Sequence, residues 1–168
     1  MKRYLNWALI LCTVITGQLF YGNKVSARTI MENYSHVSIA KEMDKKFPVP
    51  MVVKVEQTAP NQVQVTYDKD VDTKLGNKIT NYWVQDVKNV TPKGVATLGK
   101  NDKVNQNNSL KDNLAKISPV AGSQKTFVIT FSQSIPKGEE YKVVVCYVTV
   151  PGAPAYTGDN GMGTFIGK

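Results

Sequence analysis

The sequence predicts an all-β protein, an antiparallel β-sandwich that follows two N-terminal segments of different character. Short stretches alternate apolar and polar residues with the period of two that half-buried strands require. Glycine, proline and asparagine separate these stretches at short intervals, as turns do. Hardly any stretch of the chain after residue 50 carries a helical period. Together these observations favour a sandwich of short strands, with a prealbumin-like or jelly-roll arrangement as the structural alternative.

Residues 1–27 have the three-part plan of a secretory signal peptide. Lys2 and Arg3 supply the positive start, an apolar run extends from Trp7 to about Tyr21, and small residues lead to Ala27. Polar residues interrupt the apolar run, whereas a membrane-spanning helix needs about 20 apolar residues in a row. We therefore expect cleavage after Ala27 and an extracellular protein, either free or associated with the cell wall.

Cleavage would change the charge and the cysteine content of the chain. It would leave 141 of the 168 residues and lower the formal net charge from +8 to +5. A positive balance favours attraction to anionic wall or surface polymers. The lysines are scattered among acidic residues, so nucleic acid is not an expected partner. Cys12 would be lost, and Cys146 is expected to be a buried thiol without an internal disulfide.

Residues 28–50 are expected to form a leader. Apolar residues recur there at spacings of three, four or seven, at Ile30, Tyr34, Val37, Ala40 and Phe47. This spacing predicts a short amphipathic helix that ends at Pro48, and a partly disordered leader is the alternative. Residues 28–47 also offer a route to self-association, by strand addition to an open sheet edge of a neighbouring copy.

Residues 51–168 are predicted to form the sandwich domain. "VVKVEQT" alternates Val53 and Val55 against polar residues, and "QVQVTY" follows after a turn. "NYWVQDV" is the third expected strand, with Trp83 as its large packing residue. "GVATL" and "LAKISPV" are expected to be short strands in a region that is otherwise loop.

Two later stretches of sequence show stronger strand patterns. "KTFVITF" places Phe127, Ile129 and Phe131 on one face, and "YKVVVCYVTV" is apolar on both faces, which predicts a central strand. "TGDNGMGTFI" is read as a glycine-rich loop that runs into the last strand. Residues 101–116, rich in asparagine and lysine, form an insertion that is either a binding loop or a tolerated excursion.

The order of these motifs resembles the SbsA-type immunoglobulin-like domain of S-layer and other Gram-positive secreted and surface proteins. The resemblance spans about residues 51–166, and its short motifs are Tyr67, Val71-Asp72, Asn81-Tyr82, Gly138, Tyr141-Lys142-Val143, Asp159-Asn160-Gly161 and Phe165. The Asn and Gly near the end stand in swapped order, and the 101–116 insertion is additional. The resemblance implies an immunoglobulin-like fold and a structural, spacing or adhesive role outside the cell, without a catalytic residue.

The stretch "YDKDVDTK" raises the question of a calcium site. Asp68, Asp70 and Asp72 alternate as in the first half of an EF-hand loop, but Thr73 and Ile79 occupy the positions that require glycine and glutamate. A calcium site made by these aspartates with Asp159 from another loop is an alternative. The preferred interpretation is that Val71 anchors the chain where it crosses between strands and that Asp72 bonds the backbone of the turn.

No enzyme or resident cofactor is expected. The single histidine, His36, lies in the leader, away from any nucleophile in the sandwich, and one histidine with one cysteine does not complete a zinc site. The main functional hypothesis is therefore a non-catalytic structural, adhesive or assembly module at the bacterial cell surface, whose partners are wall polymers or other surface proteins. The alternative is a carbohydrate or wall-polymer binding module that uses exposed aromatic rings such as Trp83 or Tyr156.

Overall fold

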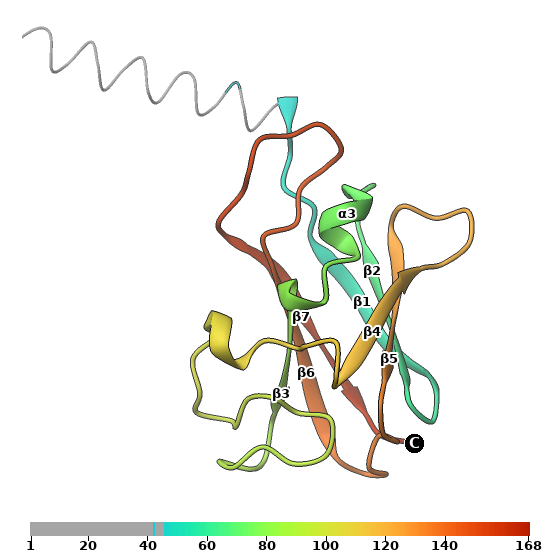
Figure 1. The fold of residues 1–168 in the computed structure, drawn as a ribbon, viewed down its shortest axis with the longest axis vertical. Helices are drawn as coiled ribbons and strands as arrows, with labels where there is room; N and C mark the ends of the chain where they lie inside the picture. Colours follow the sequence, from blue (N-terminus) through green and yellow to red (C-terminus); the bar gives the residue numbers. More distant parts are fainter. Residues whose placement is uncertain (1–41, 43–45) are drawn as a thin grey trace, which may run out of the picture. The chain divides into compact units, whose positions relative to one another are not determined.

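The computed structural model describes residue 42 and residues 46–168 (Figure 1). The predicted signal peptide, His36 and most of the predicted leader lie outside the described residues. Within the described part of the chain, no helix is both long enough and apolar enough to cross a membrane.

Strands dominate the described region. They are β1 (Val52–Ala59), β2 (Gln62–Tyr67), β3 (Tyr82–Asp86), β4 (Ala115–Pro119), β5 (Thr126–Phe131), β6 (Glu140–Cys146) and β7 (Asp159–Ile166). A single turn of α-helix, α3 (Thr73–Gly76), and two 3-10 helices, η1 (Ile79–Asn81) and η2 (Gln106–Asn108), lie in the connections.

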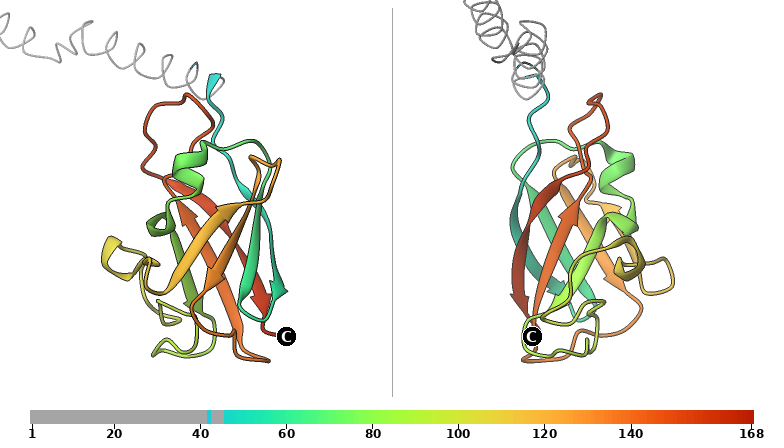
Figure 2. Two further views of the ribbon diagram at one scale, coloured as in Figure 1. Left: turned by 45° about the vertical axis from the view of Figure 1, so that its right-hand side comes forward. Right: turned by 90° about the vertical axis from the view of Figure 1, so that its left-hand side faces the viewer.

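The strands form two antiparallel sheets that pack face to face (Figure 2). The four-stranded sheet has the order β1-β2-β5-β4, and the three-stranded sheet has the order β3-β6-β7. This division of seven strands is that of the constant-type immunoglobulin fold. The predicted fold class, an immunoglobulin-like antiparallel β-sandwich, is therefore confirmed.

Alternating side chains of β2 and β5 form one wall of the core, as their sequences predict. Val63, Val65 and Tyr67 of β2 are buried, and so are Phe127, Ile129 and Phe131 of the paired β5. β6 lies between β3 and β7, and nearly all of its apolar side chains are buried. Its predicted central place is confirmed, because only a strand covered on both faces accommodates such a continuous apolar run.

The predicted face of β1 is wrong at Val53. The register of β1 against β2 shifts between Val52 and Lys54, so the alternation does not continue through this point. Val52 and Val55 pack against the core, whereas Val53 is 61% exposed. An irregularity of one residue reverses the faces of the residues on one side of it, which a strict period of two does not anticipate.

Glycine lets β7 approach β1 in the opposite sheet. A Cβ atom on Gly163 of β7 would lie 2.4 Å from Cγ2 of Val55. That separation is far inside van der Waals contact, so a side chain at position 163 would force the sheets apart. The two sheets therefore close tightly along this side of the sandwich.

The prediction of a strand at "GVATL" is wrong. Gly94 has a φ of +57°, and the N–H of Ala96 bonds the carbonyl of Lys93, so this segment begins as a turn. Only Leu98 forms an isolated bridge, with Gln85 of β3. "LAKISPV", by contrast, does form a strand, β4.

Candidate functional site: a clamp at the entry of the chain

The chain enters the sandwich at the end that also carries α3 and the loop between β6 and β7 (Figure 1). Asp68, just after β2, bonds the backbone of Met51, the residue directly before β1. Its carboxylate accepts a hydrogen bond from the N–H of Met51 at 2.8 Å, and its own N–H donates to the carbonyl of Met51 at 2.9 Å. Lys69 forms an ion pair with the same carboxylate. Desolvation alone would raise the pKa of Asp68, but the bonds from Lys69 and Met51 outweigh it and lower that pKa.

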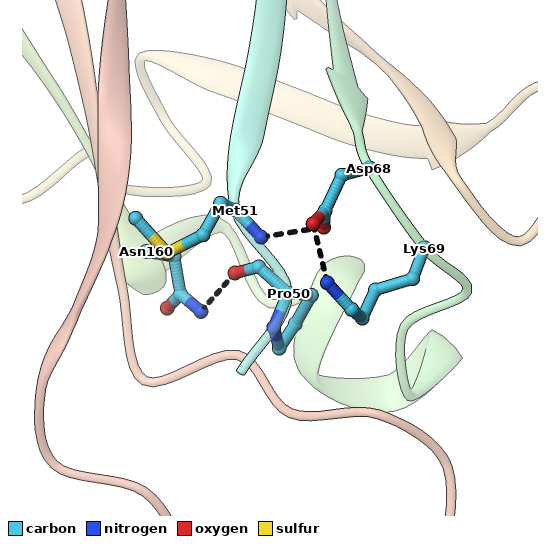
Figure 3. A network of polar contacts seen from close by, with 5 residues as sticks. All are labelled: Pro50, Met51, Asp68, Lys69 and Asn160. Carbon is cyan, nitrogen blue, oxygen red and sulfur yellow. Dashed lines mark hydrogen bonds and ion pairs between the residues drawn. The ribbon is translucent and has the colours of Figure 1, made fainter. Parts of the chain in front are cut away.

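Asn160 fixes the preceding residue from the other sheet. Its side chain is fully buried, and its amide nitrogen donates to the carbonyl oxygens of Pro50 at 2.9 Å and Val148 at 2.7 Å. Its side-chain oxygen accepts from the N–H of Val148 at 2.9 Å. Figure 3 shows the two arms of this arrangement, from Asn160 and from Asp68, meeting at consecutive residues.

We call Pro50, Met51, Asp68 and Asn160 the entry clamp. Three backbone groups that would otherwise be buried without partners receive them from the single side chain of Asn160. The clamp therefore ties the chain entry to β2 in one sheet and to β7 in the other. The sequence motif Asp159-Asn160-Gly161 does not reveal this role of Asn160, because its one local signal is a position before a glycine in a turn-rich stretch.

The connection between β2 and β3 is fixed at the same end of the molecule by the motif residues Val71, Asp72 and Asn81. Asp72 accepts a hydrogen bond from the N–H of Leu75 at 3.0 Å and so caps α3, while Val71 is fully buried. The N–H of Asp72 also bonds the carbonyl of Thr149 at 2.7 Å. The preferred interpretation of "YDKDVDTK", a buried anchor followed by a turn-bonding aspartate, is confirmed. Asn81 completes the turn by donating to the carbonyl of Leu75 at 3.1 Å.

The four aspartates considered for calcium take separate places. Asp68 and Asp72 accept backbone N–H groups as described above, and Asp159 accepts from the N–H of Gly161 at 2.6 Å. Asp70 is exposed. Among the described residues, no group of three or more His, Cys, Asp or Glu side chains is placed to hold a metal ion. Calcium binding by these aspartates stays a prediction.

A shallow polar hollow lies beside α3. It has a volume of about 540 Å³ and is lined by Asp70, Thr73 and residues 119–124, which are the last residue of β4 and the turn that leads to β5. Its wall combines one carboxylate with hydroxyl, amide and backbone groups. Such a surface offers hydrogen bonds to a hydroxylated ligand without an aromatic platform.

Trp83 is not exposed, contrary to the expectation for a binding residue. Its ring is fully buried on the outer side of the three-stranded sheet, with Leu98, Val144 and Cys146. The indole N–H donates to the carbonyl of Asn105 at 2.8 Å and to the side chain of Asn108 at 3.0 Å. The 101–116 insertion thus covers Trp83, and the ring cannot stack on a ligand in this arrangement.

Tyr156, the other aromatic residue proposed for binding, is half-buried in the loop before β7. Its hydroxyl donates to the carbonyl of Asp159 at 3.0 Å. A Cβ atom on Gly158 would lie 2.3 Å from that hydroxyl, so the phenol lies over the glycine backbone. Part of the ring remains accessible, and its role in binding stays a prediction.

Cys146 is buried, as its surroundings in the sequence predict. Burial is the main cause that raises the pKa of its thiol to about 11, and the negative charge of Asp159 adds to it. The thiol is therefore protonated at neutral pH and is not an activated nucleophile.

Comparisons with known proteins give a likeness of structure. No protein-family model and no curated protein sequence matches the chain. The structure is similar to the N-terminal part of the bacterial S-layer protein SbsC, with 15% identity, a TM-score of 0.47, and coverage of 86% of this chain and 29% of that one. It is similar to the S-layer protein rSbsC(31-844), with 14% identity, a TM-score of 0.49, and coverage of 86% and 17%. For domains 1-6 of SbsC the identity is 17%, the TM-score 0.47, and the coverage 85% and 17%. The chain thus spans less than a third of each of these longer chains.

Proposed function

We propose that the protein is a secreted, non-catalytic immunoglobulin-like module with a structural, adhesive or assembly role at the outer surface of a Gram-positive cell. The entry clamp is the observation that carries this proposal. A module that spaces or anchors must pass force from the preceding segment into its whole fold. Asp68 and Asn160 join the entry backbone at Met51 and Pro50 to both sheets, so tension is shared between them.

Features of the sequence support an extracellular location for this role. The first 27 residues carry the pattern of an export signal, and the order of the strand motifs resembles the immunoglobulin-like domains of surface proteins. A net charge of +5 after cleavage favours retention by anionic wall polymers. Residues 28–47 add a proposed self-association segment ahead of the clamp.

Cell fractionation tests this proposal. The full chain is expressed in a Gram-positive host, and the culture medium, the wall fraction, the membrane and the cytoplasm are probed for it. We expect a product shortened at Ala27 in the wall fraction, released by high salt because the attraction is electrostatic. An uncleaved product confined to the cytoplasm would contradict the proposal.

The self-association segment has its own test. Light scattering after size-exclusion chromatography compares the secreted protein with a variant that lacks residues 28–47. We expect the deletion to reduce the size of the largest oligomers. An unchanged oligomeric state would contradict the proposed role of residues 28–47 in self-association.

The polar hollow favours a second candidate function, the binding of a wall carbohydrate. Asp70 offers an exposed carboxylate to sugar hydroxyls, and Thr73 lies on the same wall. Titration of the secreted protein with solubilised wall glycan, followed by calorimetry, would show binding that Asp70→Ala weakens. Equal heats of binding for the wild type and Asp70→Ala would mean that any glycan binds at another site.

A further inference from the structure

Positive charge is concentrated in one segment of the described chain. Residues 87–116, which lead from β3 into β4 and which we call the lysine segment, contain six lysines and two aspartates, a net charge of +4. The rest of residues 46–168 contains nine lysines and eight acidic residues, a net charge of +1. All lysines of the segment are exposed, namely Lys88, Lys93, Lys100, Lys103, Lys111 and Lys116. Most of the excess positive charge therefore lies on a single connection between the two sheets.

The carboxylates beside these lysines bond the backbone of the loops. Asp102 accepts a hydrogen bond from the N–H of Gly99 at 2.8 Å. Asp86, the buried last residue of β3, accepts from the N–H groups of Lys88 at 2.9 Å and Asn89 at 2.7 Å. Both ion pairs found among the described residues lie outside the lysine segment. Its exposed ammonium groups can therefore receive an external anion.

The three-stranded sheet fixes two of these lysines next to each other. The side-chain amide of Gln85, on β3, donates to the carbonyl of Lys100 at 3.1 Å. The N–H of Lys100 bonds the carbonyl of Asn89 at 2.8 Å, which places Lys100 beside the turn that carries Lys88. The ammonium of Lys88 donates to a neutral partner, the carbonyl of Gly138, at 3.2 Å.

A third lysine is tied to the same strand through Trp83. The side-chain nitrogen of Asn108 donates to the carbonyl of Lys103 at 3.0 Å, and its side-chain oxygen accepts from the indole of Trp83 at 3.0 Å. Because Trp83 is fully buried on β3, the backbone at Lys103 is fixed while its charged end stays exposed. A fixed backbone lowers the entropy that is lost when such side chains bind a ligand.

The residue types of the lysine segment indicate the kind of anion. The segment has no arginine, whose planar fork pairs with single carboxylate or phosphate groups in a defined geometry. It also has no aromatic residue on which a nucleobase could stack. Lysine supplies a compact charge on a flexible stem. Such a surface recognises repeated negative charge, and nothing in it reads a base or a planar group.

We propose that the lysine segment binds a linear polyanion of the cell surface, a polymer that carries a phosphate or carboxylate group in each repeat, with Lys88, Lys100 and Lys103 as its central contacts. The flexible stems follow successive charges along the polymer, and the release of counterions drives the binding. The segment includes the 101–116 insertion, which the resemblance to immunoglobulin-like surface domains does not contain. The insertion is thereby assigned a binding role.

This inference deepens the surface role proposed above and rests on it for the identity of the polymer. The two fail separately. A protein that binds the polymer through the lysine segment but stays uncleaved in the cytoplasm would overturn the surface role alone. A protein that is exported, but whose binding does not depend on these three lysines, would overturn the present inference alone.

A triple variant of the full chain, Lys88→Gln, Lys100→Gln and Lys103→Gln, tests the site. Its affinity for poly(glycerol phosphate) and for poly-glutamate is measured by calorimetry at a series of salt concentrations. We expect affinity to fall by about tenfold or more, and the slope of log affinity against log salt to decrease by about 2. Binding of either polymer with this loss supports the proposal, and the polymer that binds more tightly identifies the anionic group. Circular dichroism checks that the variant folds.

The matched control removes the same charge elsewhere, at Lys74→Gln, Lys78→Gln and Lys125→Gln. These lysines are also exposed but lie in or next to α3 and in the turn before β5, at the end of the molecule opposite the loops beside β3 (Figure 1). The control should lose less than about threefold in affinity, since distant charges are screened. Equal losses for the two triple variants would show that net charge alone attracts the polymer.

Three further results would also overturn the proposal. One is a wild type that binds neither polymer at low salt. Another is tighter binding of single-stranded DNA of equal charge, which would mean that bases are recognised. The third is tighter binding of phosphatidylglycerol vesicles, which would mean that the segment docks on a membrane surface.

Discussion

The hydroxyl of Tyr67, the last residue of β2, lies 2.8 Å from the hydroxyl of Tyr82, the first residue of β3, and so joins the two sheets. Tyr82 gives its proton to the carbonyl of Gly76 at 2.6 Å. Because that hydroxyl has a single proton, Tyr67 must be the donor to Tyr82. Both rings are buried, so the chain of hydrogen bonds runs through the core.

Replacing either tyrosine by phenylalanine should have unequal effects. Tyr82→Phe leaves both the Tyr67 hydroxyl and the Gly76 carbonyl without partners, at a cost of about 2–3 kcal/mol in the free energy of unfolding. Tyr67→Phe leaves the bond to Gly76 intact and should cost about 1 kcal/mol. Urea denaturation of the two variants measures the difference. Equal losses, or a larger loss for Tyr67→Phe, would contradict the direction assigned to these hydrogen bonds.

The same burial predicts a loss of stability at alkaline pH. Burial raises the pKa of Tyr67 and Tyr82, and raises the pKa of Tyr141 to about 12 with help from the charges of Asp86 and Glu139. The thiol of Cys146 is raised to about 11. In the unfolded chain the tyrosines lose their protons near pH 10 and the cysteine thiol loses its proton near pH 9. Above these values the unfolded state binds fewer protons than the folded state, so the free energy of unfolding falls as pH rises.

Urea titrations at intervals from pH 7 to pH 11 measure this dependence. The decline should begin near pH 9 and steepen above pH 10, and Cys146→Ala should remove its first part. A free energy of unfolding that stays constant from pH 9 to pH 11 would show that these groups are not held protonated by the fold.

Asn160→Ala should be among the most destabilising substitutions of a polar residue in the domain. It removes three hydrogen bonds and leaves buried groups of Pro50 and Val148 unpaired, at a cost of about 3 kcal/mol. Asn61→Ala is the matched control, because its half-buried amide makes one bond, to the carbonyl of Phe131, and its loss should cost about 1 kcal/mol. Thermal unfolding compares the two. Similar melting temperatures for both variants would argue against the clamp.

Trp83→Phe should loosen the insertion without unfolding the sandwich. Phenylalanine cannot donate to Asn105 or Asn108, and we expect a loss of about 2 kcal/mol together with faster tryptic cleavage after Lys103 and Lys111, both exposed. Asn108→Ala, which removes one of the two acceptors, should have an intermediate effect. Cleavage at the wild-type rate would mean that the indole does not hold the insertion.

Asp72→Ala should cost about 1 kcal/mol, because it removes the side-chain cap of α3. Asp70→Ala, at an exposed neighbouring position, should change stability by less than about 0.5 kcal/mol. Addition of calcium should leave the melting temperature of the wild type unchanged, since three of the four aspartates already accept backbone N–H groups. A rise with calcium that Asp72→Ala abolishes would restore the calcium site.

Periodicity predicted the fold where one pattern continued through a whole strand. The alternation in "QVQVTY" and "KTFVITF" placed Val63, Val65, Phe127 and Ile129 correctly, because β2 and β5 pair with each other without a shift of register. It misplaced Val53, because a shift of register lies beside it. No short-range pattern encodes such an irregularity when the flanking residues are all compatible with a strand.

The candidate site was less predictable than the fold, because its contacts join residues distant in the sequence. The side chain of Asn160 bonds the carbonyl of Pro50, which lies 110 residues earlier in the sequence. No spacing or composition of the sequence signals that bond. Trp83 was expected both to pack and to bind, and only the position of the insertion decides between these roles. Asp72 was predictable, because its partner Leu75 lies within the same turn.

A pulling measurement tests the structural role most directly. A single molecule of the protein is held by its two ends, and the force that unfolds the domain is compared between the wild type and the double variant Asp68→Asn, Asn160→Ala. If the clamp carries tension from the entry into both sheets, the double variant should unfold at a clearly lower force, whereas the control Asn61→Ala, which leaves the clamp intact, should unfold near the wild-type force. The same unfolding force for the wild type and the double variant would contradict the proposal that the clamped entry makes this domain a structural module.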